Sequence, residues 1–297
     1  MIGLDKAKGA PGEACVSKLP FKGELRLMWK QHPDIPFPAD DKAVIWRFMD
    51  FPAFVDLLQS SSLHFSRLDA LGDPFEGYGT AMDYLKFKLP EQIFRASGGA
   101  SDQTSDKLEQ WRAQQARDLE QNQALALLKR IQVAETCWAN CWHLIERESV
   151  ALWKIYHGKN KPVAVQSTVG GLRDSIRSDG SNDVSIGVVQ YPENRLRPAM
   201  SSAMSSAAQA MTKTPAFAFE NELRAMLIPG PAQQVMLGTG TKVSVDLQAL
   251  VAAVRLSPVA EPWHVELVQR LIEHHGLQRL CEQSLLFAHP EFVPSVA

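Results

Sequence analysis

The chain contains 297 residues, of which 45% are hydrophobic and 22% charged, as in an ordinary globular protein. Its 31 Lys and Arg residues nearly balance its 33 Asp and Glu residues, and the net charge of −2 argues against nucleic-acid binding through a large basic surface. A small local phosphate site remains compatible with this balance. No secretory signal and no long apolar run stand out. With four cysteines, we expect free thiols, a cytoplasmic location and no membrane partner.

The chain opens with a proline-rich segment, residues 1–41, where we expect an irregular, partly ordered arm. Residues 43–49 (AVIWRFM) and 63–67 (LHFSR) predict strands, and residues 51–60 between them show helical spacing of apolar residues. Both faces of the first strand are largely apolar, which predicts that Arg47 is covered. A covered guanidinium requires an anionic partner, either a glutamate of the protein or an anion bound in a cleft.

The next segment, residues 71–79 (LGDPFEGYG), predicts a tight capped turn. Asp73 and Glu76 have the spacing of a capping box, and a proline follows the aspartate. The same two carboxylates are also candidates to face a site. Helical spacing from residue 105 to about residue 132 predicts a helical insertion, which we place at about residues 80–132.

Residues 134–144 (AETCWANCWHL) alternate as in a strand with two different faces. One face would carry Cys137, Ala139, Cys141 and His143, and the other Trp138, Asn140 and Trp142. The two cysteines would lie about 13 Å apart along such a strand, too far for one zinc ion or one disulfide. His143 is the residue of this strand that we retain as a functional candidate. A helix is predicted at residues 148–157.

A further strand, residues 161–168, leads through Ser167 and Thr168 into a helix. Their hydroxyls either cap that helix or orient a neighbouring carboxylate. Residues 184–191 predict another strand, and the low-complexity residues 201–214 predict either a small helix or a linker.

The C-terminal part alternates short strands with helices and ends with a helix at residues 262–275, followed by a glycine. Strands and helices follow one another without a strict strand–helix–strand rhythm. We therefore predict an α+β fold, with a mixed central sheet and flanking helices in a single domain at residues 42–297.

The segment FAFENELRAML, residues 217–227, places three charges among apolar residues. If residues 218–227 form a strand, Glu220 and Glu222 share one face at a distance of roughly 7 Å, and Arg224 follows them. One interpretation is a charged face on a solvated strand. The other is a catalytic pair, in which one carboxylate holds the substrate while the other moves a proton or stabilises a cation.

Several segments, in this order, resemble the bacterial family called domain of unknown function 2971. They are IWRFMDFPAFVDLL, LHFSRLDALGDPFEG, NCWHLIERESVALWKIY, VAVQSTVGGL, FAFENELRAM, VRLSPVAEPWHVELVQRL and QSLL, and together they span about residues 43–286. Met200–Ala216 corresponds least well. The resemblance indicates which segments matter, but it implies no particular reaction.

The order of Arg47, Ser167 with Thr168, and Glu220 with Glu222 is similar to the motif order of ADP-ribosyltransferases. The resemblance implies that Arg47, Ser167 and Thr168 are cofactor-binding residues, of which Arg47 binds the phosphates of NAD and Ser167 steadies the acidic pair. It also implies that Glu222 holds a ribose hydroxyl and stabilises an oxocarbenium cation. The long interval before Ser167 and the lack of a second serine after Thr168 depart from that pattern.

Three hypotheses follow from the sequence. The first is an NAD-consuming transferase or glycohydrolase, with NAD as substrate and a small molecule or a protein as acceptor. The second is a metal-dependent hydrolase or nuclease that uses Asp73, Glu76, Glu220 and Glu222, with His143 nearby. The third is a non-catalytic binding or regulatory module, in which the charged strand is a ladder of ion pairs. The most useful observation is whether Arg47, His143, Glu220 and Glu222 converge on one pocket, and we expect that at least Arg47 and Glu222 do.

Overall fold

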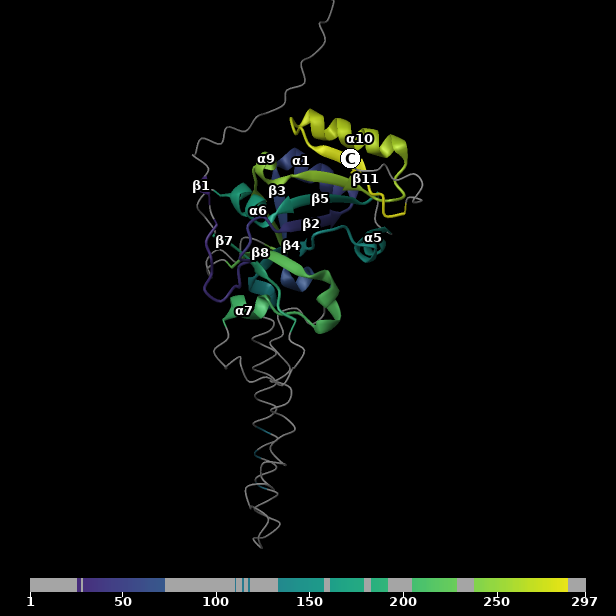
Figure 1. The fold of residues 1–297 in the computed structure, drawn as a ribbon. Helices are drawn as coiled ribbons and strands as arrows, with labels where there is room; N and C mark the ends of the chain where they lie inside the picture. Colours follow the sequence, from purple (N-terminus) through teal and green to yellow (C-terminus); the bar gives the residue numbers. More distant parts are fainter. Residues whose placement is uncertain are drawn as a thin grey trace, which may run out of the picture.

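The computed structural model describes residues 26–27, 29–72, 110, 114, 117, 133–157, 161–178, 183–191, 205–228 and 238–287. Their fold is α+β, as predicted, with a nine-stranded mixed sheet and helices on both of its faces (Figure 1). The predicted helical insertion, Asp73 and Glu76 lie outside the described residues.

The sheet contains β2 (Val44–Met49), β3 (Ser62–Arg67), β4 (Trp138–Leu144), β5 (Val163–Thr168), β7 (Val184–Val188), β8 (Glu222–Leu227), β9 (Gly240–Ser244), β10 (Ala253–Leu256) and β11 (Leu280–Gln283). The order β11-β10-β5-β2-β4-β3-β9 forms one path, and β8 joins β4 to β7 beside it. The pairing of β10 with β11 is parallel, while the other strand pairs of this sheet are antiparallel. A separate two-stranded pair is formed by β1 (Arg26–Leu27) and β6 (Arg177–Ser178).

The α-helices are α1 (Phe51–Ser60), α5 (Val150–His157), α6 (Val169–Ser175), α7 (Ser206–Ala210), α9 (Leu247–Leu250) and α10 (Pro262–His274), and two 3-10 turns are η1 (Leu68–Ala70) and η2 (Pro215–Glu220). Local sequence explains several of their ends. Asp50 caps α1 by accepting a hydrogen bond from the Ala53 backbone N–H, and Gly276, with φ +73°, follows α10.

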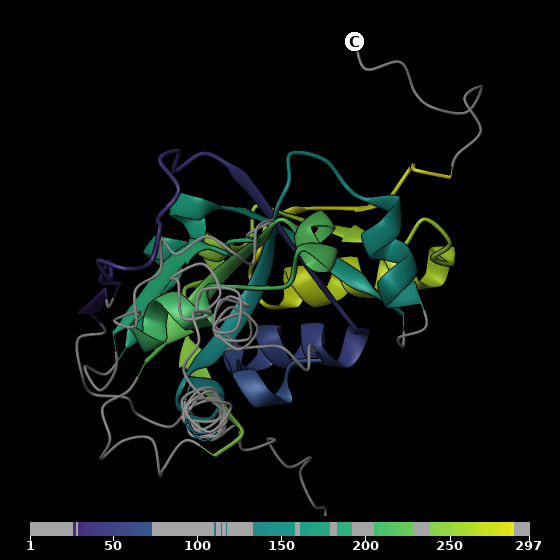
Figure 2. The ribbon, with the colours of Figure 1, turned by 90° about the horizontal axis from the view of Figure 1, so that it is seen from below.

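The main hydrophobic core lies between one face of the sheet and the helices α1, α6, α9 and α10. Phe54 and Leu58 of α1 and Ile272 of α10 pack there against alternate residues of the strands, among them Trp138 and Trp142. Figure 2 shows α1 (purple-blue) and α10 (yellow) as neighbours, and Phe51 meets His264 edge to face at 5.1 Å.

The opposite face of the sheet is covered by two separate groups of residues. Leu152 and Trp153 of α5 pack on Trp46 and Phe48 of β2. In the second group, α7 packs with Met226 of β8 and with Cys137 and Ala139, which alternate along the β4 segment. The predicted two-faced character of residues 137–143 is therefore confirmed.

Strand β4 changes partner along one of its edges. Residues 143–144 pair with β2 and residues 138–139 pair with β3, whereas residues 140–142 pair with neither. Strand β8 pairs with one edge of β4 over residues 138–143, so β2 and β3 share the opposite edge of β4. The sheet therefore forks at the middle of β4, where backbone groups need partners other than a neighbouring strand.

The acidic segment differs from its prediction. The strand begins only at Glu222, and the preceding residues, up to Glu220, form η2. Asn221 joins the two in the left-handed region, with φ 39°, and Phe219 is exposed. All six residues of β8 are buried, because β8 lies between β4 and β7 and has packed residues on both faces. The predicted solvated face is therefore wrong for Glu222.

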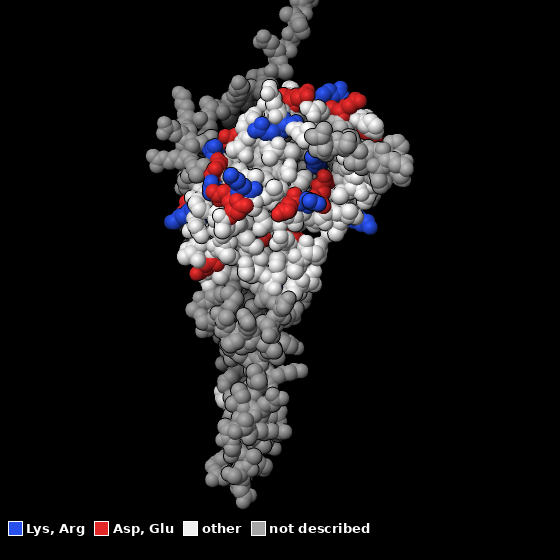
Figure 3. All heavy atoms as spheres, viewed as in Figure 1, with Lys and Arg blue, Asp and Glu red and all other residues white. Residues whose placement is uncertain are grey.

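The visible surface of the described part mixes positive and negative side chains (Figure 3). Such mixing agrees with the nearly balanced composition of the chain. Within the described ranges, no helix combines the length and the apolar character that a membrane crossing requires.

Candidate functional site

A cavity of about 250 Å³ opens where the sheet forks, between the group packed under α5 and the group packed under α7. We call it the fork pocket. Its charged and polar lining includes Arg47, Cys141, His143, Lys213, Glu220 and Glu222. The predicted convergence of Arg47 and Glu222 on one pocket is therefore confirmed, and His143 and Glu220 line the same pocket. Phe48 and Tyr156 add aromatic rings, stacked at 5.8 Å between centroids.

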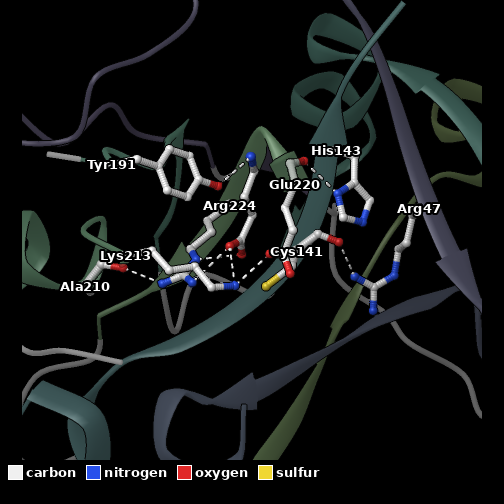
Figure 4. Close-up of polar contacts among 9 residues, drawn as sticks. Arg47, Cys141, His143, Tyr191, Ala210, Lys213, Glu220 and Arg224 are labelled. Atoms are coloured by element: carbon white, nitrogen blue, oxygen red, sulfur yellow. Dashed lines mark hydrogen bonds and ion pairs between the residues drawn. The ribbon is translucent and has the colours of Figure 1, made fainter. Parts of the chain in front are cut away.

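Arg47 lies on β2 just beyond the point where β2 and β4 separate. Its Nη1 donates a hydrogen bond of 2.7 Å to the backbone carbonyl of Cys141, in the stretch of β4 that lacks a strand partner on this edge (Figure 4). The sequence raised a glutamate of the protein as one possible partner, but no described carboxylate forms an ion pair with this guanidinium. Burial lowers the pKa of Arg47, although the group remains charged.

The remaining nitrogens of Arg47, Nε and Nη2, make no hydrogen bond with the described residues. Neither is an enclosed, unpaired atom, so both border open space at the pocket. A partly buried cation without a counter-ion is costly, and a carboxylate or phosphate would satisfy its planar pair of donors. Arg47 is therefore the group of this pocket best suited to hold an anion.

His143 projects from β4 into the same pocket. Its Nδ1 lies 2.8 Å from the backbone carbonyl of Glu220, and its ring meets Phe48 edge to face at 5.8 Å (Figure 4). A carbonyl only accepts hydrogen bonds, so Nδ1 carries the proton. Burial lowers the pKa of His143, partly opposed by that hydrogen bond, and thus favours the neutral ring.

The predicted acidic pair is engaged by two cations. Arg224 donates from Nε and Nη2 to Glu222, at 2.7 and 3.1 Å, and Nη1 of Arg224 donates to the backbone carbonyl of Ala210. Lys213 Nζ bridges the two glutamates, at 2.7 Å from Glu220 and 3.3 Å from Glu222. Glu222 and Arg224 are only 2% and 0% exposed. This pair is therefore a buried, two-pronged ion pair beneath the pocket.

The ionisation of this cluster follows from its contacts. Burial alone would raise the pKa of Glu222, but Arg224 and Lys213 outweigh it and lower that pKa to about 2. Burial opposes the charge of Lys213, yet the two carboxylates raise its pKa above the ordinary value. Among the described residues, Glu220 and Glu222 are paired with Lys213 and Arg224, whereas Arg47 forms no ion pair with a described carboxylate.

Cys141 and Tyr191 support the acidic pair. The Cys141 thiol hydrogen-bonds Glu222, and burial, reinforced by that carboxylate, raises its pKa well above the ordinary value. A neutral, buried thiol is a poor nucleophile. The Tyr191 hydroxyl accepts a hydrogen bond of 2.9 Å from the Glu222 backbone N–H at the start of β8.

Ser167 and Thr168 do not line the fork pocket. Ser167 is buried on β5, and its hydroxyl donates to the Thr168 carbonyl at 3.4 Å. The Thr168 hydroxyl accepts a hydrogen bond of 2.9 Å from the Gly171 backbone N–H and thereby caps α6. Of the two roles considered for these hydroxyls, the structure shows helix capping for Thr168 and no contact of either with the acidic pair.

Sequence reasoning missed Lys213 and Tyr156 as pocket residues. Lys213 stands in a low-complexity stretch, and a signal was present, because it is the single charge within residues 201–216. Tyr156 lies within the helix predicted at residues 148–157, which gave no sign of a pocket. It lines the pocket because its helix, α5, packs on the face of β2 that carries Phe48.

Within the described ranges, no group of three or more His, Cys, Asp and Glu side chains is placed to hold a metal ion. Glu220 and Glu222 are both paired with cations, which opposes the approach of a further cation. The metal-dependent hypothesis also relied on Asp73 and Glu76, which the structure does not describe.

Comparisons of the chain with family models, with curated proteins and with solved structures found no match. The two resemblances noted in the sequence therefore stay predictions.

Proposed function

We propose that the chain binds a small oxyanion, a carboxylate or a phosphate, in the fork pocket. The observation that carries the proposal is Arg47, whose guanidinium borders the pocket with two nitrogens that no described residue satisfies. The nearby carboxylates of Glu220 and Glu222 are already paired with Lys213 and Arg224 rather than with Arg47. Phe48 and Tyr156 provide apolar surface for the rest of the ligand.

The cavity limits the size of the ligand. Its volume of about 250 Å³ is below the roughly 300–1,000 Å³ of ordinary ligand pockets. We therefore infer a ligand of a few carbon atoms, or the anionic end of a longer one.

The experiment is a thermal-shift and calorimetric screen of small carboxylates and phosphates. An anion that binds only the folded chain raises its midpoint, and at 100 times Kd the stabilisation is about 2.7 kcal/mol. In Arg47→Gln the affinity of the anions that bind should fall roughly tenfold to hundredfold, because a hydrogen-bonded ion contact contributes about 1.5–3 kcal/mol.

Arg279→Gln is the matched control. Arg279 also donates to backbone carbonyls, those of Val251 and Gln248 among them, but it does not line the fork pocket. This variant should bind anions like the parent chain. The proposal would be overturned if Arg47→Gln bound anions as tightly as the parent chain, or if the parent chain bound none of the anions.

A second candidate is the NAD-consuming transferase or glycohydrolase, with a small molecule or a protein as acceptor. It is favoured by one observation, namely that Arg47, Glu220 and Glu222 line the same pocket. The engagement of Glu222 by Arg224 and the position of Ser167 on the far side of β2 weaken it. Incubation with NAD should release nicotinamide, and release should stop in Arg47→Gln. Absence of both NAD binding and nicotinamide release would exclude this candidate.

We also propose that the chain works in a reducing cytoplasm. In support, Cys137, Cys141 and Cys281 are free thiols among the described residues.

A further inference from the structure

The fork pocket presents a hydrogen-bond acceptor as well as a cation. His143 Nε2 has no hydrogen-bond partner among the described residues, and it is not enclosed by protein. Since the Glu220 carbonyl fixes the proton on Nδ1, Nε2 keeps its lone pair. Figure 4 shows the His143 ring and the Arg47 guanidinium on neighbouring strands, near each other on one side of the site.

A second acceptor lies nearby. Lys213 binds Oε2 of Glu220, and Oε1 of that carboxylate makes no hydrogen bond with a described residue. A plain anion such as acetate would satisfy Arg47 but would leave these acceptors facing its apolar part. Desolvating an unpaired acceptor costs free energy, so the pocket favours a ligand that also donates a hydrogen bond.

We propose that the ligand of the fork pocket is a hydroxylated oxyanion, whose anionic group is bound by Arg47 and whose hydroxyl donates to His143 Nε2. This inference rests on the proposed anion binding and makes His143 a residue that determines specificity. An ammonium group in place of the hydroxyl would meet the same acceptor, and the experiment separates the two.

The probes are matched sets that differ only in the donor. Lactate, alanine and propionate form the carboxylate set, and 1,2-propanediol 1-phosphate and propyl phosphate form the phosphate set. In the parent chain, the hydroxylated member should bind about tenfold more tightly than its deoxy analogue, the effect of one hydrogen bond in a covered site. Whichever set binds more tightly identifies the anionic group.

His143→Asn is the decisive variant. Its amide can still donate toward the Glu220 carbonyl, but it is too short to replace Nε2. The preference for the hydroxylated member should therefore disappear, while propionate or propyl phosphate keeps its affinity. His274→Asn, a change at an exposed histidine on α10, is the control and should preserve the preference.

The outcomes separate this inference from the proposed function. If hydroxylated and deoxy anions bind equally and both depend on Arg47, anion binding stands and the role of His143 is overturned. A preference that survives in His143→Asn, or a preference for alanine over lactate, also overturns it. If no probe binds, the proposed function fails and this inference fails with it.

Discussion

At the scale of single residues, the fork pocket separates two kinds of charge. Glu222 and Arg224 satisfy each other beneath the pocket, whereas Arg47 has only a carbonyl as its partner in the described structure. The sequence showed the three charges but not this division of roles. The partner of each charged side chain depends on which distant strands pair with one another. That pairing leaves no pattern in the local sequence.

Replacing Glu222 with Gln should destabilise the fold. The change keeps the shape but leaves Arg224 as a buried cation without its two-pronged partner, and we expect a loss of about 3–5 kcal/mol in the free energy of unfolding. Urea denaturation measures this loss. Glu282→Gln, which removes one partner of a surface ion pair with Arg255, is the control and should cost only about 0–1 kcal/mol. An equally small effect of Glu222→Gln would show that the buried pair contributes little.

The same pair predicts how stability depends on pH. The pKa of Glu222 falls from 4.5 to about 2 on folding, so its carboxylate stabilises the fold above pH 4.5 and loses this effect as the pH falls toward 2. The stability gap between the parent chain and Glu222→Gln should therefore narrow over this range, by on the order of 3 kcal/mol. A gap that stays constant from about pH 6 to pH 2 would contradict a lowered pKa for Glu222.

At the scale of elements, the strands and helices with strong local patterns were predicted well. Residues 51–60 and 262–275 have helical spacing with proline or capping signals at their ends, and they form α1 and α10 with nearly those bounds. The acidic strand was predicted four residues too early, because the apolar residues of η2 continue the alternation of β8. A left-handed Asn221 separates the two, and alternation does not reveal it.

Thr168 provides a prediction at the scale of one element. Thr168→Ala removes the cap of α6 and should cost about 0.5–2 kcal/mol of stability, measured by urea denaturation, without changing anion affinity. Thr168→Ser restores the hydroxyl and should recover most of the loss. If Thr168→Ala instead weakened ligand binding while stability stayed the same, the cofactor-binding role predicted for Thr168 from the motif order would gain support.

At the scale of the whole molecule, the pocket results from the branching of the sheet. Because β4 has three strand partners, its edge toward β2 and β3 is left open in the middle, and the side chains of Arg47 and Asn140 supply the missing hydrogen bonds. The sequence predicted the α+β class and the convergence of Arg47 and Glu222. It could not predict the fork, since branching is decided by contacts between segments up to about a hundred residues apart.

The most direct measurement is a crystal structure of the chain soaked with 4-bromobenzoate, whose aryl bromide does not alkylate histidine or cysteine, recorded at the bromine absorption edge. The anomalous signal gives the position of the anion independently of any affinity. We predict one bromine peak in the fork pocket, with the carboxylate within about 2.7–3.2 Å of Arg47 Nε or Nη2. The same soak of Arg47→Gln should lack that peak. A fully occupied peak elsewhere with the fork pocket empty, or an unchanged peak in Arg47→Gln, would contradict the assignment of Arg47 as the anion-binding residue.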